Sequence, residues 1–243
     1  MLVPKTLDEL HSALSQGGQV VGGGAGIMSG AMHPRPPAVA IDLSGLGLEG
    51  MDPVAGHVGA MVRLAALERF ELAGRNAVAA AVAATASPTA RRLITVGGVL
   101  GGRLHGGDLT PALAVHGACV QVLTRDAPQL RWLPLLDLAD LARPFAVLRV
   151  TLGAAGPSAF RRIAGHQTVA PSLVSVAGLR HPNGTHTFCV SAATPRAVLV
   201  DAERLPPVEK FLDDHRASAA YRREMTSVLI SQLTQELAGL EAA

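Results

Sequence analysis

The sequence predicts an α+β protein of two or three lobes, and three observations support this prediction. Short apolar strands alternate with helical patterns up to about residue 153, as in small α/β units. Four strand patterns then follow one another before a single long helix. The chain has 243 residues, 49% of them hydrophobic, which is enough for a sizeable core. We expect one domain over residues 1–153, with lobes of about 1–50 and 51–153, and a C-terminal α+β domain over 154–243.

The first lobe begins with a helix whose start carries a capping pattern. Thr6 is followed three residues later by Glu9, and this pair forms a capping box. Leucines recur at helical spacing from position 7 to position 14, and Gly17-Gly18 predicts the end of the helix. The lobe continues with predicted strands at Gln19–Val21 and Ala38–Leu43.

The second lobe combines strands with alanine-rich helices. Apolar patterns predict strands and a hairpin at Val58–Ala65, Phe145–Leu152, and Cys119–Leu123 with Leu130–Leu133. Helices are predicted at Leu67–Leu72, Asn76–Ala84 and Leu109–Gly117. Asp108 stands at the N-cap position of the last helix. We expect little regular structure over residues 95–99.

The C-terminal domain is predicted as a sheet followed by a long helix. Its strands are expected at Phe160–Ile163, Leu173–Leu179, His186–Ser191 and Ala197–Val200. Pro182-Asn183-Gly184 predicts a turn between the middle two strands. The closing helix is expected over about residues 217–240. One side of this helix carries Tyr221, Met225, Val228, Leu229, Leu233 and Leu240.

Composition excludes several classes of function. A net charge of +2 and an aromatic content of 3% argue against nucleic-acid binding. The two cysteines, Cys119 and Cys189, lie far apart without a C-x-x-C pair, so the chain itself holds no iron–sulfur cluster or structural zinc. We see no secretory signal and no long apolar stretch. A cytoplasmic protein without membrane insertion is therefore expected.

Two glycine clusters follow apolar stretches, the first at Gly22-Gly23-Gly24-Ala25-Gly26 and the second at Gly97-Gly98. Glycines let backbone N–H groups approach a ligand closely, so two such loops facing each other would hold a diphosphate. The first cluster is not the dinucleotide fingerprint, because Ile27 stands where the third glycine belongs, and the chain has no P-loop motif. A nucleotide site and an ordinary glycine-rich turn both remain open.

With Asp108, which follows Val99 by nine positions, these loops resemble the FAD-binding (medium) subunit or domain of molybdenum hydroxylases. That family, which includes carbon monoxide dehydrogenase and xanthine dehydrogenase, has an early Ala-Gly-Gly-x-x-Leu loop and a later Thr-Ile-Gly-Gly-Asn loop. The resemblance extends over nearly the whole chain. It includes Ile41-Asp42-Leu43, Ala86-Ser87-Pro88, Asp108-Leu109-x-Pro111, Phe160-Arg161 and Tyr221-Arg222-Arg223-x-Met225.

The resemblance implies non-covalent FAD bound at its diphosphate by both loops. The matching positions are Gly22, Gly23, Gly24, Ala25, Gly26 and Ile27 in the first loop and Thr95, Val96, Gly97, Gly98 and Val99 in the second. It implies that Asp108 accepts hydrogen bonds from cofactor hydroxyls, although a plain helix cap is the alternative. Leu148 matches a residue under the flavin ring or packs in the core. Arg161 matches a cation near the flavin or lies in solvent.

The resemblance also implies an assembly with two partners. A large subunit would carry molybdopterin, and a small subunit would carry 2Fe–2S clusters. Electrons would pass from those clusters to the flavin and on to an external acceptor, so no catalytic acid or base is expected in this chain. His33 and His105 lie near the loops and are interpreted as ordinary loop histidines rather than covalent flavin attachment points.

Three departures from the family pattern weaken the expected site. Ala25 and Gly26 replace polar donors, and Val99 replaces the asparagine of the second loop. Each lost side-chain donor costs about 1 kcal/mol or more of binding free energy. A flavin-free scaffold of the same fold is therefore the alternative function, and a stand-alone flavoprotein oxidase is a third.

Overall fold

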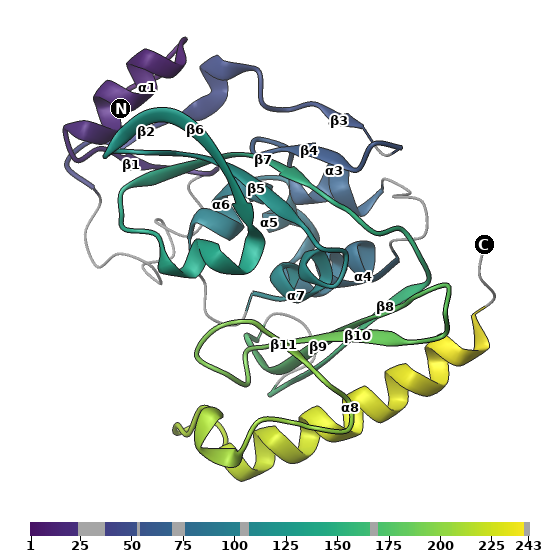
Figure 1. The fold of residues 1–243 in the computed structure, drawn as a ribbon. Coiled ribbons are helices and arrows are strands. Elements are labelled where there is room, and N and C mark those ends of the chain that lie inside the picture. The colour runs from purple at the N-terminus through teal and green to yellow at the C-terminus, as the bar shows by residue number, and fades with distance from the viewer. Residues whose placement is uncertain (24–36, 53, 70–75, 103–106, 166–169, 241–243) are drawn as a thin grey trace. The chain divides into compact units, whose positions relative to one another are not determined.

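The computed structural model describes residues 1–23, 37–52, 54–69, 76–102, 107–165 and 170–240. It has the mixed helix and strand content that the α+β prediction requires. The chain divides into two compact units, each assembled from three stretches of sequence (Figure 1). Unit 1 comprises Met1–Leu67, Pro88–Leu104 and Cys119–Thr151, and unit 2 comprises Glu68–Ser87, His105–Ala118 and Leu152–Ala243. Unit 2 therefore draws on both sides of position 153, whereas unit 1 lies wholly before it.

Unit 1 contains a five-stranded antiparallel sheet and a small parallel pair of strands. The sheet has the order β3-β4-β7-β5-β6, with bounds Met51–Asp52, His57–Gly59, Phe145–Thr151, Cys119–Thr124 and Ala127–Pro134. The parallel pair is β1 (Gln19–Val20) and β2 (Ala40–Ile41). The helices of unit 1 are α1 (Leu7–Ser15), α3 (Leu64–Glu68), α5 (Pro88–Arg91) and α6 (Val96–Gly101), with 3-10 turns at Leu43–Leu46 and Leu135–Asp140.

The capping pattern predicted for α1 is confirmed. The Thr6 side chain accepts a hydrogen bond from the N–H of Glu9 at 3.2 Å. The Glu9 carboxylate in turn accepts from the N–H of Lys5 at 2.6 Å, one residue before the cap. Helical spacing places Leu10 and Leu14 on the side of α1 that faces the core of unit 1, and both are fully buried.

Unit 2 is a four-stranded antiparallel sheet with helices on both faces. The strand order is β11-β10-β9-β8, with bounds Val198–Val200, His186–Ser191, Ser172–Arg180 and Ser158–Ala164. The long helix α8 (Ala219–Gly239) packs against β8 and β9, and α4 (Asn76–Thr85) and α7 (Leu109–Ala114) pack on the opposite face (Figure 1). A 3-10 turn at Val208–Lys210 precedes α8. All four predicted C-terminal strands are thus confirmed.

Two predicted elements of the second lobe differ from the structure. The strand expected at Val58–Ala65 ends at Gly59, and the helix expected from Leu67 begins at Leu64 instead. Residues 60–64 leave the sheet and run antiparallel to residues 94–97, with an isolated bridge between Arg63 and Thr95. A continuous apolar run does not distinguish a strand from such a mixed segment, because periodicity is absent in both. Residues 70–72 of the predicted helix lie outside the described residues.

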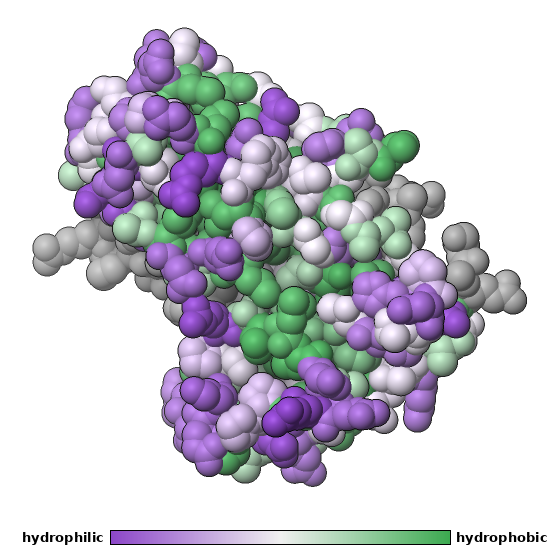
Figure 2. Space-filling view, in the orientation of Figure 1, coloured by the Kyte–Doolittle hydropathy of each residue, from purple (hydrophilic) through white to green (hydrophobic). Residues whose placement is uncertain are grey.

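The side of α8 predicted from the sequence is only partly the buried one: Leu229 and Leu233 are buried, and Met225 and Leu240 pack against the core. Tyr221 and Val228 are each 40% exposed, whereas the buried positions are Arg222, Thr226, Leu229, Ile230, Leu233 and Leu237. Hydrophilic residues predominate over the outer side of α8 in the space-filling view (Figure 2). The predicted side comprised apolar residues and tyrosine and did not include the buried arginine at the start of the helix.

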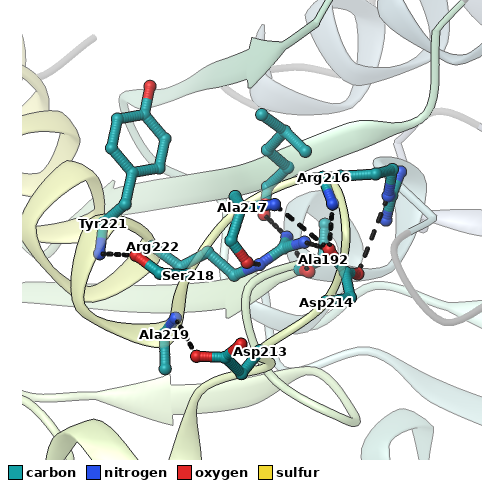
Figure 3. Close-up of polar contacts among 10 residues, drawn as sticks. Ala192, Asp213, Asp214, Arg216, Ala217, Ser218, Ala219, Tyr221 and Arg222 are labelled. Carbon is teal, nitrogen blue, oxygen red and sulfur yellow. Dashed lines mark hydrogen bonds and ion pairs between the residues drawn. The ribbon is translucent and has the colours of Figure 1, made fainter.

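Arg222 can be buried because oxygen atoms of the protein take the place of water as acceptors for its guanidinium N–H groups. It donates to the carbonyl oxygens of Leu173 at 2.6 Å and Ala192 at 3.2 Å, and to the Asp214 carboxylate at 2.8 Å (Figure 3). The N–H of Arg216 and the Arg222 side chain hold the pKa of Asp214 down at about 2. This network ties α8 to the ends of two strands and to the loop that precedes the helix.

Candidate functional site

The two glycine loops lie directly against each other within unit 1. A Cβ atom at Gly22 would lie 2.3 Å from the Cα atom of Gly98. A Cβ atom at Gly98 would lie 2.6 Å from the carbonyl oxygen of Gly22. These separations leave no room for a side chain at either position, so each glycine permits the close approach of the other loop.

Gly23 is the position where conformation and space both require glycine. Its φ is +68°, in the left-handed region that L residues rarely adopt. A Cβ atom there would lie 1.8 Å from the carbonyl oxygen of Leu93. The remaining predicted members of this loop, Gly24, Ala25, Gly26 and Ile27, lie outside the described residues, as do His33 and His105.

The backbone donors of the first loop are available to a ligand. The N–H of Val21 donates to the Ile41 carbonyl at 2.9 Å and so completes the pairing of β1 with β2. Within the described part of the chain, the N–H groups of Gly22 and Gly23 that follow have no protein acceptor. Successive N–H groups of this kind bind anionic oxygens. The first loop therefore fits a diphosphate by the chemistry of its donors.

The second loop is a helix start, contrary to the prediction of little regular structure. Thr95 caps α6, and its hydroxyl accepts a hydrogen bond from the N–H of Gly98 at 3.1 Å. Val99 lies within the helix and is only 5% exposed. Two glycines at the start of a helix obscured its presence in the sequence, because glycine has a low helix propensity.

The N–H groups at the start of α6 all have acceptors within unit 1. A helix ordinarily leaves its first N–H groups without intrahelical partners. Here four successive donors are bonded at 2.8–3.1 Å: Val96 to the Val62 carbonyl, Gly97 to the Ala60 carbonyl, Gly98 to the Thr95 hydroxyl and Val99 to the Thr95 carbonyl. The extended segment before α3 thus supplies two of the acceptors, a contribution that no sequence motif indicated.

Asp108 lies in unit 2 and is bonded there to other side chains. Its carboxylate accepts from the Ser172 hydroxyl at 2.7 Å and from the Arg162 guanidinium at 3.2 Å. It stands at the N-cap position of α7, but its side chain makes no capping hydrogen bond, so that alternative prediction is wrong. Burial raises the pKa of Asp108, and the bonds from Ser172 and Arg162 offset part of this effect.

Arg161 and Arg162 occupy opposite faces of the four-stranded sheet, as successive residues of a strand do. Arg161 forms an ion pair of 3.0 Å with Glu236 of α8, and the side chains of both are substantially exposed. Arg162 points instead toward α7, where it meets Asp108. The structure therefore separates Arg161 from Asp108, and Arg162 is the cation that sequence reasoning missed. Strand alternation was the signal for it.

Leu148 belongs to the hydrophobic core of unit 1 and is only 2% exposed. It lies on β7 and clusters with Leu10 and Leu14 of α1. This position agrees with the packing alternative, and its contact with a flavin stays a prediction.

Replacing Asp108 by Asn should change how stability depends on pH. A raised pKa means that the folded chain holds the proton more tightly than the unfolded chain does. The stability that this group contributes is therefore full below the ordinary value of 3.8 and is lost as the pH rises through the raised pKa. The D108N variant lacks this loss, so its unfolding free energy relative to the wild type should increase from about pH 3 to about pH 7. Urea unfolding at a series of pH values measures this difference. A difference that does not vary with pH would contradict the prediction.

The residues that the structure describes also bear on metal binding and on membrane insertion. The described residues contain no group of three or more His, Cys, Asp or Glu side chains that would hold a metal ion. None of the helices in the described ranges has the length and apolar character needed to cross a membrane. Cys189 is buried and Cys119 partly buried, and both are free thiols.

Comparison with known protein families gives one match. Residues 1–149 match the family described as the FAD binding domain in molybdopterin dehydrogenase, which covers more than half of the chain and both glycine loops. No curated protein sequence matches the chain.

Solved structures share the fold over nearly its whole length. Quinoline 2-oxidoreductase from Pseudomonas putida 86 matches with a TM-score of 0.81 at 18% identity, covering 97% of this chain and 95% of the other. Carbon monoxide dehydrogenase from Hydrogenophaga pseudoflava, in a form lacking the Mo-pyranopterin moiety, gives 0.81 at 17% identity, covering 97% and 96%. Reconstituted CO dehydrogenase from Oligotropha carboxidovorans gives 0.80 at 16% identity with the same coverage.

Proposed function

Because the chain belongs to the family of FAD-binding domains in molybdopterin dehydrogenases, we propose that it is the flavin-carrying subunit of a molybdenum hydroxylase. Its relatives of known structure include a CO dehydrogenase and a quinoline 2-oxidoreductase, which supports a role as an oxidoreductase component. When bound, FAD supplies the capacity to accept electrons and to pass them on. The chain binds and orients the cofactor and contributes no acid or base to the chemistry.

The proposed cofactor site is centred on the first glycine loop. The N–H groups of Gly22 and Gly23 bind the diphosphate, because they are adjacent, lack protein acceptors among the described residues, and are fixed by the packing of this loop against Gly98 and Leu93. Residues 24–27, which lie outside the described residues, remain proposed members of the site. Asp108 and Arg161 remain proposed cofactor neighbours on the resemblance alone, and in the structure they form ion pairs with Arg162 and Glu236, respectively.

The proposal includes two partner subunits. A large subunit holds molybdopterin and oxidises the substrate, and a small subunit holds 2Fe–2S clusters that deliver electrons to the flavin. An external acceptor then reoxidises the flavin. The cytoplasmic location expected from the sequence is part of this proposal. The observation that carries the proposal is the family match over residues 1–149, which spans both loops.

A flavin-free scaffold of the same fold is the second candidate, and one observation favours it. Val99, at the position of the family's asparagine, is buried inside α6 and offers no polar group to a ligand. A scaffold would hold the two partner subunits together without carrying electrons.

The purified chain should bind FAD and show the visible absorption spectrum of a flavin. Chromatography of the nucleotide released by heat should identify FAD rather than FMN, because the proposed site recognises the diphosphate. Chain purified without cofactor should regain the spectrum on incubation with FAD. A colourless chain that FAD does not reconstitute would exclude the flavin subunit and support the scaffold.

A further inference from the structure

Gly97 and Gly98 match the family positions for diphosphate contact, yet their N–H groups are already used. Gly97 donates to the Ala60 carbonyl at 2.8 Å, and Gly98 donates to the Thr95 hydroxyl at 3.1 Å. Both bonds have ordinary lengths for N–H donors. A diphosphate would have to break these two hydrogen bonds, which fix the start of α6, before it could accept hydrogen bonds from the same N–H groups. The need for glycine at these positions therefore has another origin.

The space around the two glycines shows what that origin is. A Cβ atom at Gly97 would lie 2.6 Å from the Cβ atom of Ala60. A Cβ atom at Gly98 would lie 2.6 Å from the Gly22 carbonyl oxygen and 3.0 Å from the Gly22 Cα atom. The first glycine lets α6 approach residue 60, and the second lets the first loop rest on the first turn of α6. Gly97 and Gly98 therefore allow backbone segments to pack closely, because neither residue has a side chain.

We propose that Gly97 and Gly98 position the first glycine loop and do not themselves bind the FAD diphosphate. Gly98 acts through Gly22: it lets the first loop lie on α6, so that the N–H groups of Gly22 and Gly23 are held in one direction for the ligand. Thr95 takes part by keeping the Gly98 N–H bonded. This inference rests on the proposed function for its ligand, but the packing role exists in the FAD-free chain as well.

Hydrogen exchange of backbone N–H groups tests the proposal directly. In the FAD-free chain, the amides of Gly97 and Gly98 should already be protected, and those of Gly22 and Gly23 should exchange fast. Adding FAD should protect Gly22 and Gly23 and leave the protection of Gly97 and Gly98 nearly unchanged. Fast exchange at Gly97 and Gly98 without FAD, followed by protection with FAD, would overturn the proposal.

Two alanine variants of the same helix separate positioning from direct binding. Gly98→Ala should lower the unfolding midpoint of the FAD-free chain, because its Cβ meets Gly22. It should also weaken FAD binding by about tenfold or more, the effect of losing one hydrogen bond to a charged group. Gly101→Ala is the matched control, since among the described residues its Cβ would meet only Val147, at 4.0 Å. This control should keep FAD affinity and stability, or gain stability.

Thr95 provides a rescue experiment. Thr95→Val removes the hydroxyl that caps α6, whereas Thr95→Ser keeps it. The Val variant should lose the exchange protection of Gly98 and FAD affinity. The Ser variant should retain both. A Gly98→Ala chain with unchanged FAD-free stability would refute the positioning role. If the wild-type chain binds no FAD, the proposed function fails, while the exchange and stability of the FAD-free chain still decide the packing role.

Discussion

Replacing Arg222 by Ala should destabilise the chain by about 3–5 kcal/mol. The guanidinium is fully buried, so its removal leaves the carbonyl oxygens of Leu173 and Ala192 without a donor and opens a cavity beneath α8. Unpaired buried acceptors and lost packing each cost free energy, and here they add at one site. Urea unfolding of the FAD-free chain, followed by far-ultraviolet circular dichroism, measures the change.

The next residue provides the control. Arg223 is exposed, and its one described hydrogen bond runs to the Pro206 carbonyl at 3.0 Å. Arg223→Ala should therefore change the unfolding free energy by about 0.5 kcal/mol or less. Equal effects of the two variants would mean that the buried network contributes nothing beyond an exposed arginine.

Replacing Gly23 by Ala should abolish the shape of the first glycine loop and with it FAD binding. The variant combines a positive φ with a Cβ atom 1.8 Å from the Leu93 carbonyl oxygen, so the backbone has to move. We expect FAD affinity to fall by about a hundredfold or more, which corresponds to losing two hydrogen bonds to a charged group. Fluorescence titration of the FAD-free variant with FAD measures this loss.

Gly17→Ala is a control for this variant, because both glycines have a positive φ but only Gly23 has a close neighbour where a Cβ atom would lie. Gly17 has a φ of +82°, and a Cβ atom there would meet no atom of the described residues within 4 Å. It should cost about 1 kcal/mol of stability through the positive φ alone and leave FAD affinity unchanged. If Gly23→Ala binds FAD as well as Gly17→Ala does, the first loop does not carry the cofactor.

The local elements could be predicted wherever the pattern and the physical cause lie within a few residues. The capping box of Thr6 and Glu9 is one case, and the strands of unit 2 are another. The helix α6 could not be predicted, because its start depends on acceptors at Ala60 and Val62, more than thirty residues earlier in the chain. Propensity describes a residue's own backbone and does not include a partner strand.

The buried polar groups were the other limit of sequence reasoning. The burial of Arg222 could not be predicted, because an arginine is buried only when it is paired and its acceptors come from distant strands. Asp108 was weighed as a cap or a cofactor contact, whereas its partners Ser172 and Arg162 lie on a sheet formed much later in the chain. The positions were visible in the sequence, but the tertiary contacts that define their roles were not.

The interleaving of the two units has a consequence for how the chain can be divided. The chain passes between them five times, after Leu67, Ser87, Leu104, Ala118 and Thr151. A fragment that begins at residue 154 would lack α4 and α7, and one face of its four-stranded sheet would be left without a cover. Neither unit is a contiguous piece of polypeptide, so neither can be removed, swapped or synthesised first without the other. Evolution of this chain by exchange of whole units would require several simultaneous cuts, which favours inheritance as one block.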